Sequence, residues 1–289
     1  MNNKLVSWLI FILLCLIWGS SFILMKVSQE GLTPSQIAAL RIGSAGLVFL
    51  PFAVVHIRHI PKKKLGTVIL TGVFGNFLPA FCFAIAILHM DSSLAGILNS
   101  LTPLCVALIA LTFFREKISS RSLAGIIIGF AGLCLLTFAQ NDVSVGNVGY
   151  AGLVFLGTIS YGINVNIVGH YLKDLNPVKV GTVSLAFMLF PSLLVLWQED
   201  FFSIPFSDPV VQWSVIDSVV LGIVGSAIAT VLFYMLVKKA GGLFASLVTY
   251  GIPFVALGWG FIFGESITLI SIISLAIILL GVYLGTRNN

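Results

Sequence analysis

Two basic residues lie inside stretches of the sequence that are otherwise apolar. Arg41 stands in the run 37–43 with no acidic residue at helical spacing, and Lys26 follows a long apolar stretch. A charged side chain within a membrane is costly, so it is expected to face a cavity or a partner. In a cavity, the planar guanidinium of Arg41 would bind a carboxylate or a phosphate. Alternatively, Arg41 bonds carbonyls of a neighbouring helix, and Lys26 extends its amine to the membrane interface.

Neutral polar and aromatic side chains in the same apolar stretches are candidates to line such a cavity. An Asn amide can hydrogen-bond a solute, although bonding between neighbouring helices is its commoner use. An aromatic ring can line a cavity for an amphipathic solute, or it can simply pack. The candidate substrate-binding residues beside Arg41 and Lys26 are Trp18, Asn76, Asn99, Tyr161, Asn164 and Tyr234.

Motifs for other chemistry are missing from the sequence. It contains no Gly-x4-Gly-Lys-Ser/Thr loop for ATP and no His-Glu-x-x-His pair for zinc. It also lacks a Gly-x-Ser-x-Gly elbow with a histidine and an aspartate in reach. The four cysteines have no metal-ligand spacing, and the four histidines stand at or near the ends of apolar stretches. We therefore expect no catalytic residue, no metal site, no cofactor and no enzymatic activity.

Helices that span a membrane are the elements that must position these residues. The chain is 58% hydrophobic and 9% charged, with a mean hydropathy of +1.11, whereas soluble domains carry about 25% charged residues. Apolar stretches of about 20 residues, the length that crosses a bilayer, recur along the chain. We predict an all-α membrane protein with ten transmembrane helices. Their expected positions are 5–28, 34–56, 65–88, 92–114, 121–139, 147–170, 177–197, 213–237, 243–264 and 267–286.

The distribution of basic residues predicts the orientation of the chain. Lysine and arginine gather in alternate connections, which are the cytoplasmic ones in membrane proteins. With both termini in the cytoplasm, only Lys26 and Arg41 among the 15 Lys and Arg residues fall elsewhere. One span more or fewer would reverse the bias partway along the chain. The charges therefore support ten spans in an N-in, C-in arrangement.

The two halves of the chain are similar to each other. The segment Gly72-Val73-Phe74-Gly75 aligns with Gly222-Ile223-Val224-Gly225 at an offset of 150 residues, which also aligns Pro103 with Pro253. Each half, 1–140 and 146–287, holds five predicted spans. Because five is odd, the second half enters the membrane from the opposite side, and the repeats are inverted. Such repeats are typical of transporters whose substrate binds between them.

The segments that open the first half and close both halves resemble those of EamA-type transporters of the drug/metabolite transporter superfamily. The resemblance lies in Trp18-Gly19-Ser20-Ser21-Phe22 with Lys26, Pro34 and Arg41, in 101–103 and 114–117, and in 252–253 and 263–265. It implies export or exchange of small metabolites, amino acids or drugs across a bacterial inner membrane without ATP.

The second half departs from the first at two aligned positions. Tyr161-Gly162 replaces Trp18-Gly19, and Ser184 aligns with Arg41. Any charged contact to a substrate would therefore come from the first half.

The leading hypothesis is that the chain is a secondary transporter, which exports amino acids or similar small metabolites by alternating access. The alternatives are efflux of drugs or other organic solutes by the same fold, and a receptor or scaffold that transports nothing. The expected partners are a small-molecule substrate and the lipid bilayer, with no nucleic acid. The sequence leaves the substrate, the coupling ion, the direction of flux and the choice between monomer and homodimer open.

Overall fold

The structure is a computed structural model that describes residues 3–89, 98–140, 148–262 and 269–286, and every regular element in these ranges is helical. The elements are α1 (Asn3–Ser28), α2 (Pro34–His56), η1 (Ile57–His59), α3 (Lys62–Gly72), η2 (Val73–Phe77), α4 (Leu78–His89), α6 (Thr102–Phe113), α7 (Ser120–Gln140), α8 (Val148–Tyr171), α9 (Pro177–Gln198), η3 (Phe201–Ser203), α10 (Pro209–Val220), η4 (Leu221–Ile228), α11 (Ala229–Ala240), α12 (Gly242–Ser246), α13 (Val248–Ile262) and α14 (Leu269–Thr286).

Six helices among the described residues are long and apolar enough to cross a membrane. They are Lys4–Ser21, Pro34–His59, Lys62–His89, Gly149–Tyr171, Pro177–Gln198 and Pro209–Ala240. Four shorter apolar helices accompany them, namely Thr102–Phe113, Ser120–Leu135, Gly242–Val255 and Ile272–Gly285. These ten helices fall at the positions predicted from the sequence, although residues 92–97, 147, 263–264 and 267–268 of the predicted spans lie outside the described residues.

Three helices begin at a proline that follows a capping residue. The side chains of Thr33, Asn176 and Asp208 each accept a hydrogen bond from a backbone amide in the first turn of α2, α9 and α10, respectively. Proline suits the first helical position because its missing N–H would have no partner there. The polar caps and the prolines thus fix where these apolar helices start.

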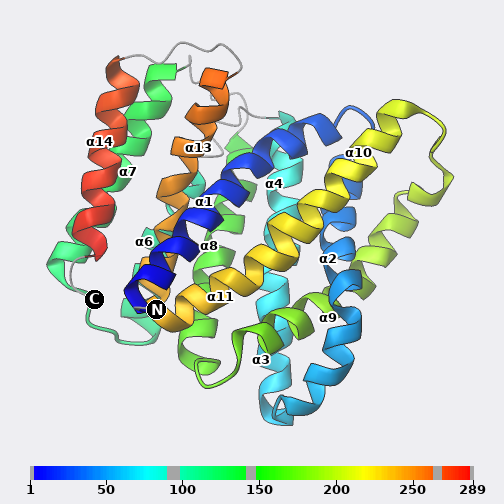
Figure 1. Ribbon diagram of the computed structural model, residues 1–289, viewed down its shortest axis with the longest axis horizontal. Coiled ribbons are helices and arrows are strands. Elements are labelled where there is room, and N and C mark those ends of the chain that lie inside the picture. Colours follow the sequence, from blue (N-terminus) through cyan, green and yellow to red (C-terminus); the bar gives the residue numbers. More distant parts are fainter. Residues whose placement is uncertain (1–2, 90–97, 141–147, 263–268, 287–289) are drawn as a thin grey trace.

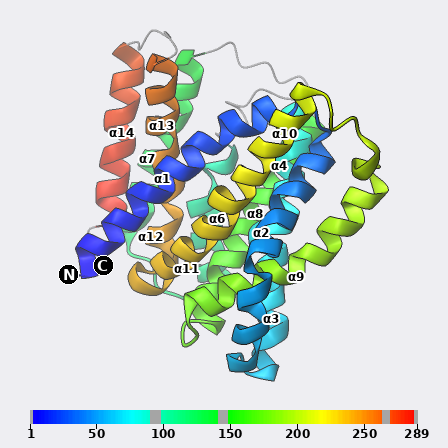
Figure 2. The ribbon, with the colours of Figure 1, turned by 45° about the vertical axis from the view of Figure 1, so that its right-hand side comes forward.

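The helices form one bundle in which the last helix of each half of the chain lies at one side. Figures 1 and 2 show α14 beside α7 there, with α2, α3 and α9 at the other side and α1 and α11 crossing between them. An added Cβ at Gly125 or Gly281 would collide with the backbone of the opposite helix. Small residues permit this close approach of α7 and α14, as is usual between helices in membranes.

Two of the long spans contain a π-helical segment that the sequence analysis did not predict. Residues 73–77 form η2 between α3 and α4, and residues 221–228 form η4 between α10 and α11. Both segments contain glycines of the repeated Gly-x-x-Gly motif. A π-helical insertion widens a helix locally and is frequently found at functional sites.

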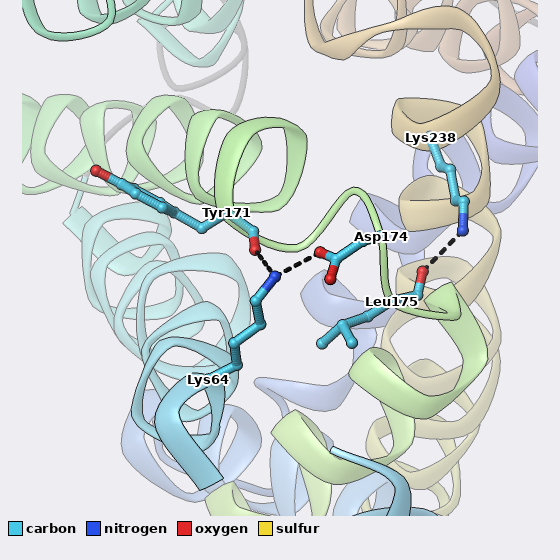
Figure 3. Close-up of polar contacts among 5 residues, drawn as sticks. All are labelled: Lys64, Tyr171, Asp174, Leu175 and Lys238. Atoms are coloured by element: carbon cyan, nitrogen blue, oxygen red, sulfur yellow. Dashed lines mark hydrogen bonds and ion pairs between the residues drawn. The ribbon is translucent and has the colours of Figure 1, made fainter. Parts of the chain in front are cut away.

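The connections at one end of the bundle are held together by lysines (Figure 3). Lys64 Nζ, from α3, lies 2.5 Å from Asp174 Oδ1 and donates to the Tyr171 carbonyl at 2.9 Å. Lys238 Nζ, from α11, donates to the Leu175 carbonyl at 2.9 Å. The hydrogen bond from Lys64 lowers the pKa of the Asp174 carboxyl. The connection between α8 and α9 is therefore joined to both α3 and α11.

A polar contact also closes the opposite end of the bundle. Gln36 Nε2, at the start of α2, donates to the Glu199 carbonyl just beyond α9 at 2.8 Å. The start of α2 and the end of α9 therefore lie together, away from the end that the lysines join (Figure 1).

Candidate functional site

A cavity of about 110 Å³ lies between the helices at the centre of the bundle. Seven of the eight residues predicted to bind substrate line it, and they come from α1, α2, η2, α8 and α11 and from the segment before α6. They are Trp18, Arg41, Asn76, Asn99, Tyr161, Asn164 and Tyr234. The side chain of the eighth, Lys26, lies outside the described residues.

Arg41 is anchored to the second half of the chain at one edge of its guanidinium. Its Nε donates to Ser226 Oγ of η4 at 2.8 Å. Its two terminal nitrogens have no hydrogen-bond or ion-pair partner among the described residues. No acidic residue is among those described as lining this cavity. Within the described lining, no side chain neutralises the positive charge of Arg41.

Trp18 is anchored to the same π-helical segment. Its Nε1 donates to the Gly225 carbonyl at 3.0 Å, and its ring lies against Phe233 with 5.4 Å between the ring centroids. The polar edge of the indole is thus satisfied by protein, and its apolar face remains for the cavity.

Asn76 has one satisfied and one unsatisfied amide atom. Thr230 Oγ1 donates to Asn76 Oδ1 at 2.8 Å. Asn76 Nδ2 is buried and has no hydrogen-bond partner among the described residues, and the whole residue is 8% exposed. Leaving a buried donor without a partner costs about 1–3 kcal/mol. Asn76 is thus an incompletely hydrogen-bonded polar group at the edge of the cavity.

Asn164 and Tyr234 form a second polar pair beside η2. The Tyr234 hydroxyl donates to Asn164 Oδ1 at 3.2 Å and lies 3.4 Å from the Thr71 carbonyl. A Cβ added to Gly75 would approach Asn164 Nδ2 to 2.5 Å. Asn164 therefore packs directly on the backbone of η2, a position that only glycine leaves open.

Asn99 and Tyr161 reach the cavity from two neighbouring elements. Thr102 Oγ1 donates to the Asn99 carbonyl at 2.6 Å, at the turn that precedes α6. The Tyr161 ring, on α8, lies 6.0 Å from the Phe83 ring. Both residues belong to an aromatic and polar lining that suits an amphipathic solute.

A second cavity of about 310 Å³ meets the first one at Val165, which lines both. Its walls include Glu116, Lys117 and His170, and His170 Nε2 lies 2.9 Å from Glu116 Oε1. We call it the inner pocket. A Cβ added to Gly242 of α12 would approach Val165 Cγ1 to 2.7 Å. The side chain of Val165 on Gly242 is therefore part of the layer between the two cavities.

Sequence reasoning did not identify Ser226 or Thr230, although one signal pointed to the first. Ser226 follows Gly225 as Asn76 follows Gly75, at the same offset of 150 residues. The residue after the repeated motif is thus polar in both halves, and both copies take part in a hydrogen bond at the cavity. In the part of the chain that the structure describes, no three His, Cys, Asp or Glu side chains are grouped to hold a metal ion.

Comparison with known proteins identifies one family. The EamA-like transporter family matches the chain twice, over residues 6–138 and 149–287. An uncharacterized transporter of Archaeoglobus fulgidus is 27% identical over 98% of this chain and 99% of its own. Protein PagO of Salmonella typhimurium is 22% identical over 98% of this chain and 93% of its own.

A solved crystal structure has the same fold. It superimposes on this chain with a TM-score of 0.72 and 19% identity, covering 97% of this chain and 96% of its own. At that identity, the likeness establishes the fold alone.

Proposed function

Because the chain belongs to the EamA-like transporter family of the drug/metabolite transporter superfamily, we propose that it exports amino acids or similar small carboxylate-bearing metabolites by alternating access. Membership of this family makes it a multi-pass membrane transporter and not an enzyme. The proposal adds the class of substrate, the direction and the mechanism. It places the substrate in the central cavity, with no metal or cofactor taking part.

One observation carries the substrate class, namely the charge of Arg41. Within the described lining, no acidic side chain balances this guanidinium. An unpaired charge away from water is costly, and a carboxylate on the substrate would offset that cost. Lys26, if its amine faces inward, would add to the same attraction. A cationic drug would instead be repelled, so we favour metabolites over drugs.

The remaining lining residues would orient and select the rest of the solute. Asn76, Asn99 and Asn164 offer amide groups to its polar atoms. Trp18, Tyr161 and Tyr234 offer aromatic surface to its apolar part. The cavity of about 110 Å³ suits a solute of a few non-hydrogen atoms better than a large drug.

We further propose ten spans in two inverted five-helix repeats, residues 1–140 and 146–287, with both termini in the cytoplasm of a bacterial cell and the spans in its inner membrane. The π-helical segments η2 and η4 support this arrangement because they overlap at the offset of 150 residues. The lysine-rich end of the bundle in Figure 3 would then face the cytoplasm. Substrate would enter the inner pocket from that side and pass Val165 on its way to the central cavity.

Counterflow into proteoliposomes tests this function. Purified protein is reconstituted, the vesicles are loaded with one unlabelled L-amino acid, and uptake of its labelled form is measured for each proteinogenic amino acid in turn. We expect counterflow for at least one amino acid and no competition from its carboxamide, because the amide lacks the charge that Arg41 needs. Counterflow that the carboxamide inhibits as well as the acid would contradict recognition of a carboxylate. The absence of counterflow for all of them would contradict the proposed substrate class.

A further inference from the structure

Ser226 lies where it can control how the guanidinium of Arg41 is presented to a ligand. It is 1% exposed, and its Oγ accepts the hydrogen bond from Arg41 Nε at 2.8 Å. One helical turn earlier, a Cβ added to Gly222 would collide with the Arg41 carbonyl. The backbone of η4 therefore rests directly on α2 at Arg41, and Ser226 cannot retreat without separating the two helices.

This hydrogen bond leaves the guanidinium with one free edge at which a planar anion can form two hydrogen bonds. A guanidinium can bind a carboxylate side-on, through Nε and one terminal nitrogen, or end-on, through both terminal nitrogens. In Arg41, the Nε–H already donates its hydrogen bond to Ser226 Oγ. The two terminal nitrogens have no partner among the described residues. Only the end-on arrangement keeps both of its hydrogen bonds available to a ligand.

A second contact braces the same segment of η4. Trp18 Nε1 donates to the carbonyl of Gly225, the residue before Ser226, at 3.0 Å. Two side chains of the first half, one from α1 and one from α2, thus bond to consecutive residues of a segment in the second half. The position of the Ser226 hydroxyl is therefore set by contacts on both sides.

We propose that Ser226 is a positioning residue, which fixes the Arg41 guanidinium so that a substrate carboxylate binds end-on to its two terminal nitrogens. The inference rests on the proposed function, because it specifies how the same cavity holds the same class of substrate. Ser226 itself is not among the residues that line the cavity. It acts through Arg41 by removing rotational freedom that binding would otherwise have to restrict.

The test is counterflow with the amino acid that the wild-type protein exchanges most rapidly among the proteinogenic L-amino acids, tested one at a time. We expect Ser226→Ala to raise the half-saturating concentration about fivefold to 20-fold and to leave the maximal rate within about twofold. Ser226→Thr keeps the hydroxyl and should restore the wild-type value to within about twofold. Ser226→Cys, which has nearly the same shape and a much weaker acceptor, should resemble Ser226→Ala and serves if the alanine variant fails to fold.

Ser218→Ala is the matched control. Ser218 is a buried serine of the same span, and it lines neither cavity. In the part of the chain that the structure describes, its Oγ has no hydrogen-bond partner. Its loss should change neither the half-saturating concentration nor the maximal rate. A purely structural role for serines in this span would make the two alanine variants alike.

A double-mutant cycle separates positioning from general damage. Lysine at position 41 keeps the charge and has no Nε to be held. In the Arg41→Lys background, Ser226→Ala should therefore change the half-saturating concentration less than twofold. An undiminished effect in that background, or no effect in the wild-type background, would overturn the positioning role and leave the proposed function standing. Failure of the wild-type protein to exchange any amino acid would instead overturn the proposed function and this inference with it.

Discussion

The two cavities that meet at Val165 differ in how their charges are balanced. The described lining of the central cavity holds a single charged side chain, Arg41. The lining of the inner pocket holds both signs, because Glu116 lies beside Lys117 in the chain and 2.9 Å from His170. Charges of both signs neutralise one another, whereas a single buried charge favours a ligand of the opposite sign. Under the proposed function, the central cavity would therefore recognise the substrate and the inner pocket would give access to it.

Removing one positive charge from each cavity should have the largest effect and tests whether the two cavities have different roles. Arg41→Ala should lower counterflow at subsaturating substrate by about 100-fold, because a carboxylate loses its buried, charge-assisted partner. Lys117→Ala should lower it by less than about twofold, because its charge is partly neutralised by neighbours and water. Counterflow in proteoliposomes measures both variants under the same conditions.

Equal effects of these two variants would contradict the division of roles. Transport that survives Arg41→Ala would remove Arg41 from the site without affecting the assignment to the transporter family. Arg41→Lys should fall between wild type and Arg41→Ala, because it keeps the charge and loses the planar fork.

A smaller side chain at position 165 tests whether Val165 forms a barrier between the two cavities. Val165→Ala removes two methyl groups from the contact with Gly242, worth about 1.6 kcal/mol of buried apolar surface. We expect passive loss of labelled amino acid from preloaded proteoliposomes to become about tenfold faster. Leu232→Ala, at a half-buried position that lines neither cavity, controls for general loosening of the core. Equal leakage of both variants would show that Val165 has no special part in the barrier.

The unsatisfied amide of Asn76 predicts a smaller effect, in which a substitution raises the stability of the protein while transport falls. The double variant Asn76→Leu with Thr230→Val replaces both hydrogen-bonding partners by apolar groups of similar shape and removes the unpaired donor. We expect the free energy of unfolding to rise by about 1 kcal/mol, seen as a higher melting temperature in detergent. Transport should fall, as is common when a strained site is relaxed.

The single variant Thr230→Val supplies the control for that experiment. Thr230→Val alone leaves both amide atoms of Asn76 without a partner, so it should melt below wild type. A double variant that melts below Thr230→Val would mean that the cavity depends on Asn76 for its shape, and not only for its polarity.

The smallest effect is expected from the solvent-accessible ion pair between Lys64 and Asp174 at one end of the bundle. The hydrogen bond from Lys64 places the pKa of Asp174 below its ordinary value of 3.8. The pair therefore contributes its stability above about pH 4 and loses it as the pH falls through the lowered pKa. The melting temperature of Asp174→Asn should be less than about one degree below wild type at pH 7, and equal to it near pH 2. A difference that persists at pH 2 would contradict an ionic origin.

The sequence predicted the ten helices well because their physical cause is local. An apolar stretch of about 20 residues is the length that a bilayer requires, and the capped prolines Pro34 and Pro177 stand at the predicted starts of two of these stretches. The third capped proline, Pro209, begins α10 ahead of the predicted span 213–237. The π-helical segments were missed because their cause is tertiary. Gly75 and Gly222 admit close neighbours from α8 and α2, and no local pattern distinguishes them from other glycines in spans.

The candidate site was predicted in the same uneven way. Arg41 stood out because an unmatched charge in an apolar stretch is rare. Ser226 and Thr230 did not, because a hydroxyl in a helix usually bonds to the carbonyl one turn earlier. Ser192 does so, with the Met188 carbonyl at 2.8 Å. Ser226 and Thr230 bond across to α2 and η2 instead, which only the packing of the helices reveals.

The pairing of α7 with α14 has a consequence for biosynthesis. Between the end of α7 at Gln140 and the start of α14 at Leu269 lie 128 residues, which a ribosome adds in about 6–26 seconds at 5–20 residues per second. Throughout that interval, the face of α7 that carries Gly125 has no partner from its own chain. A neighbouring chain that offers its own α14 in that window would produce an exchanged dimer.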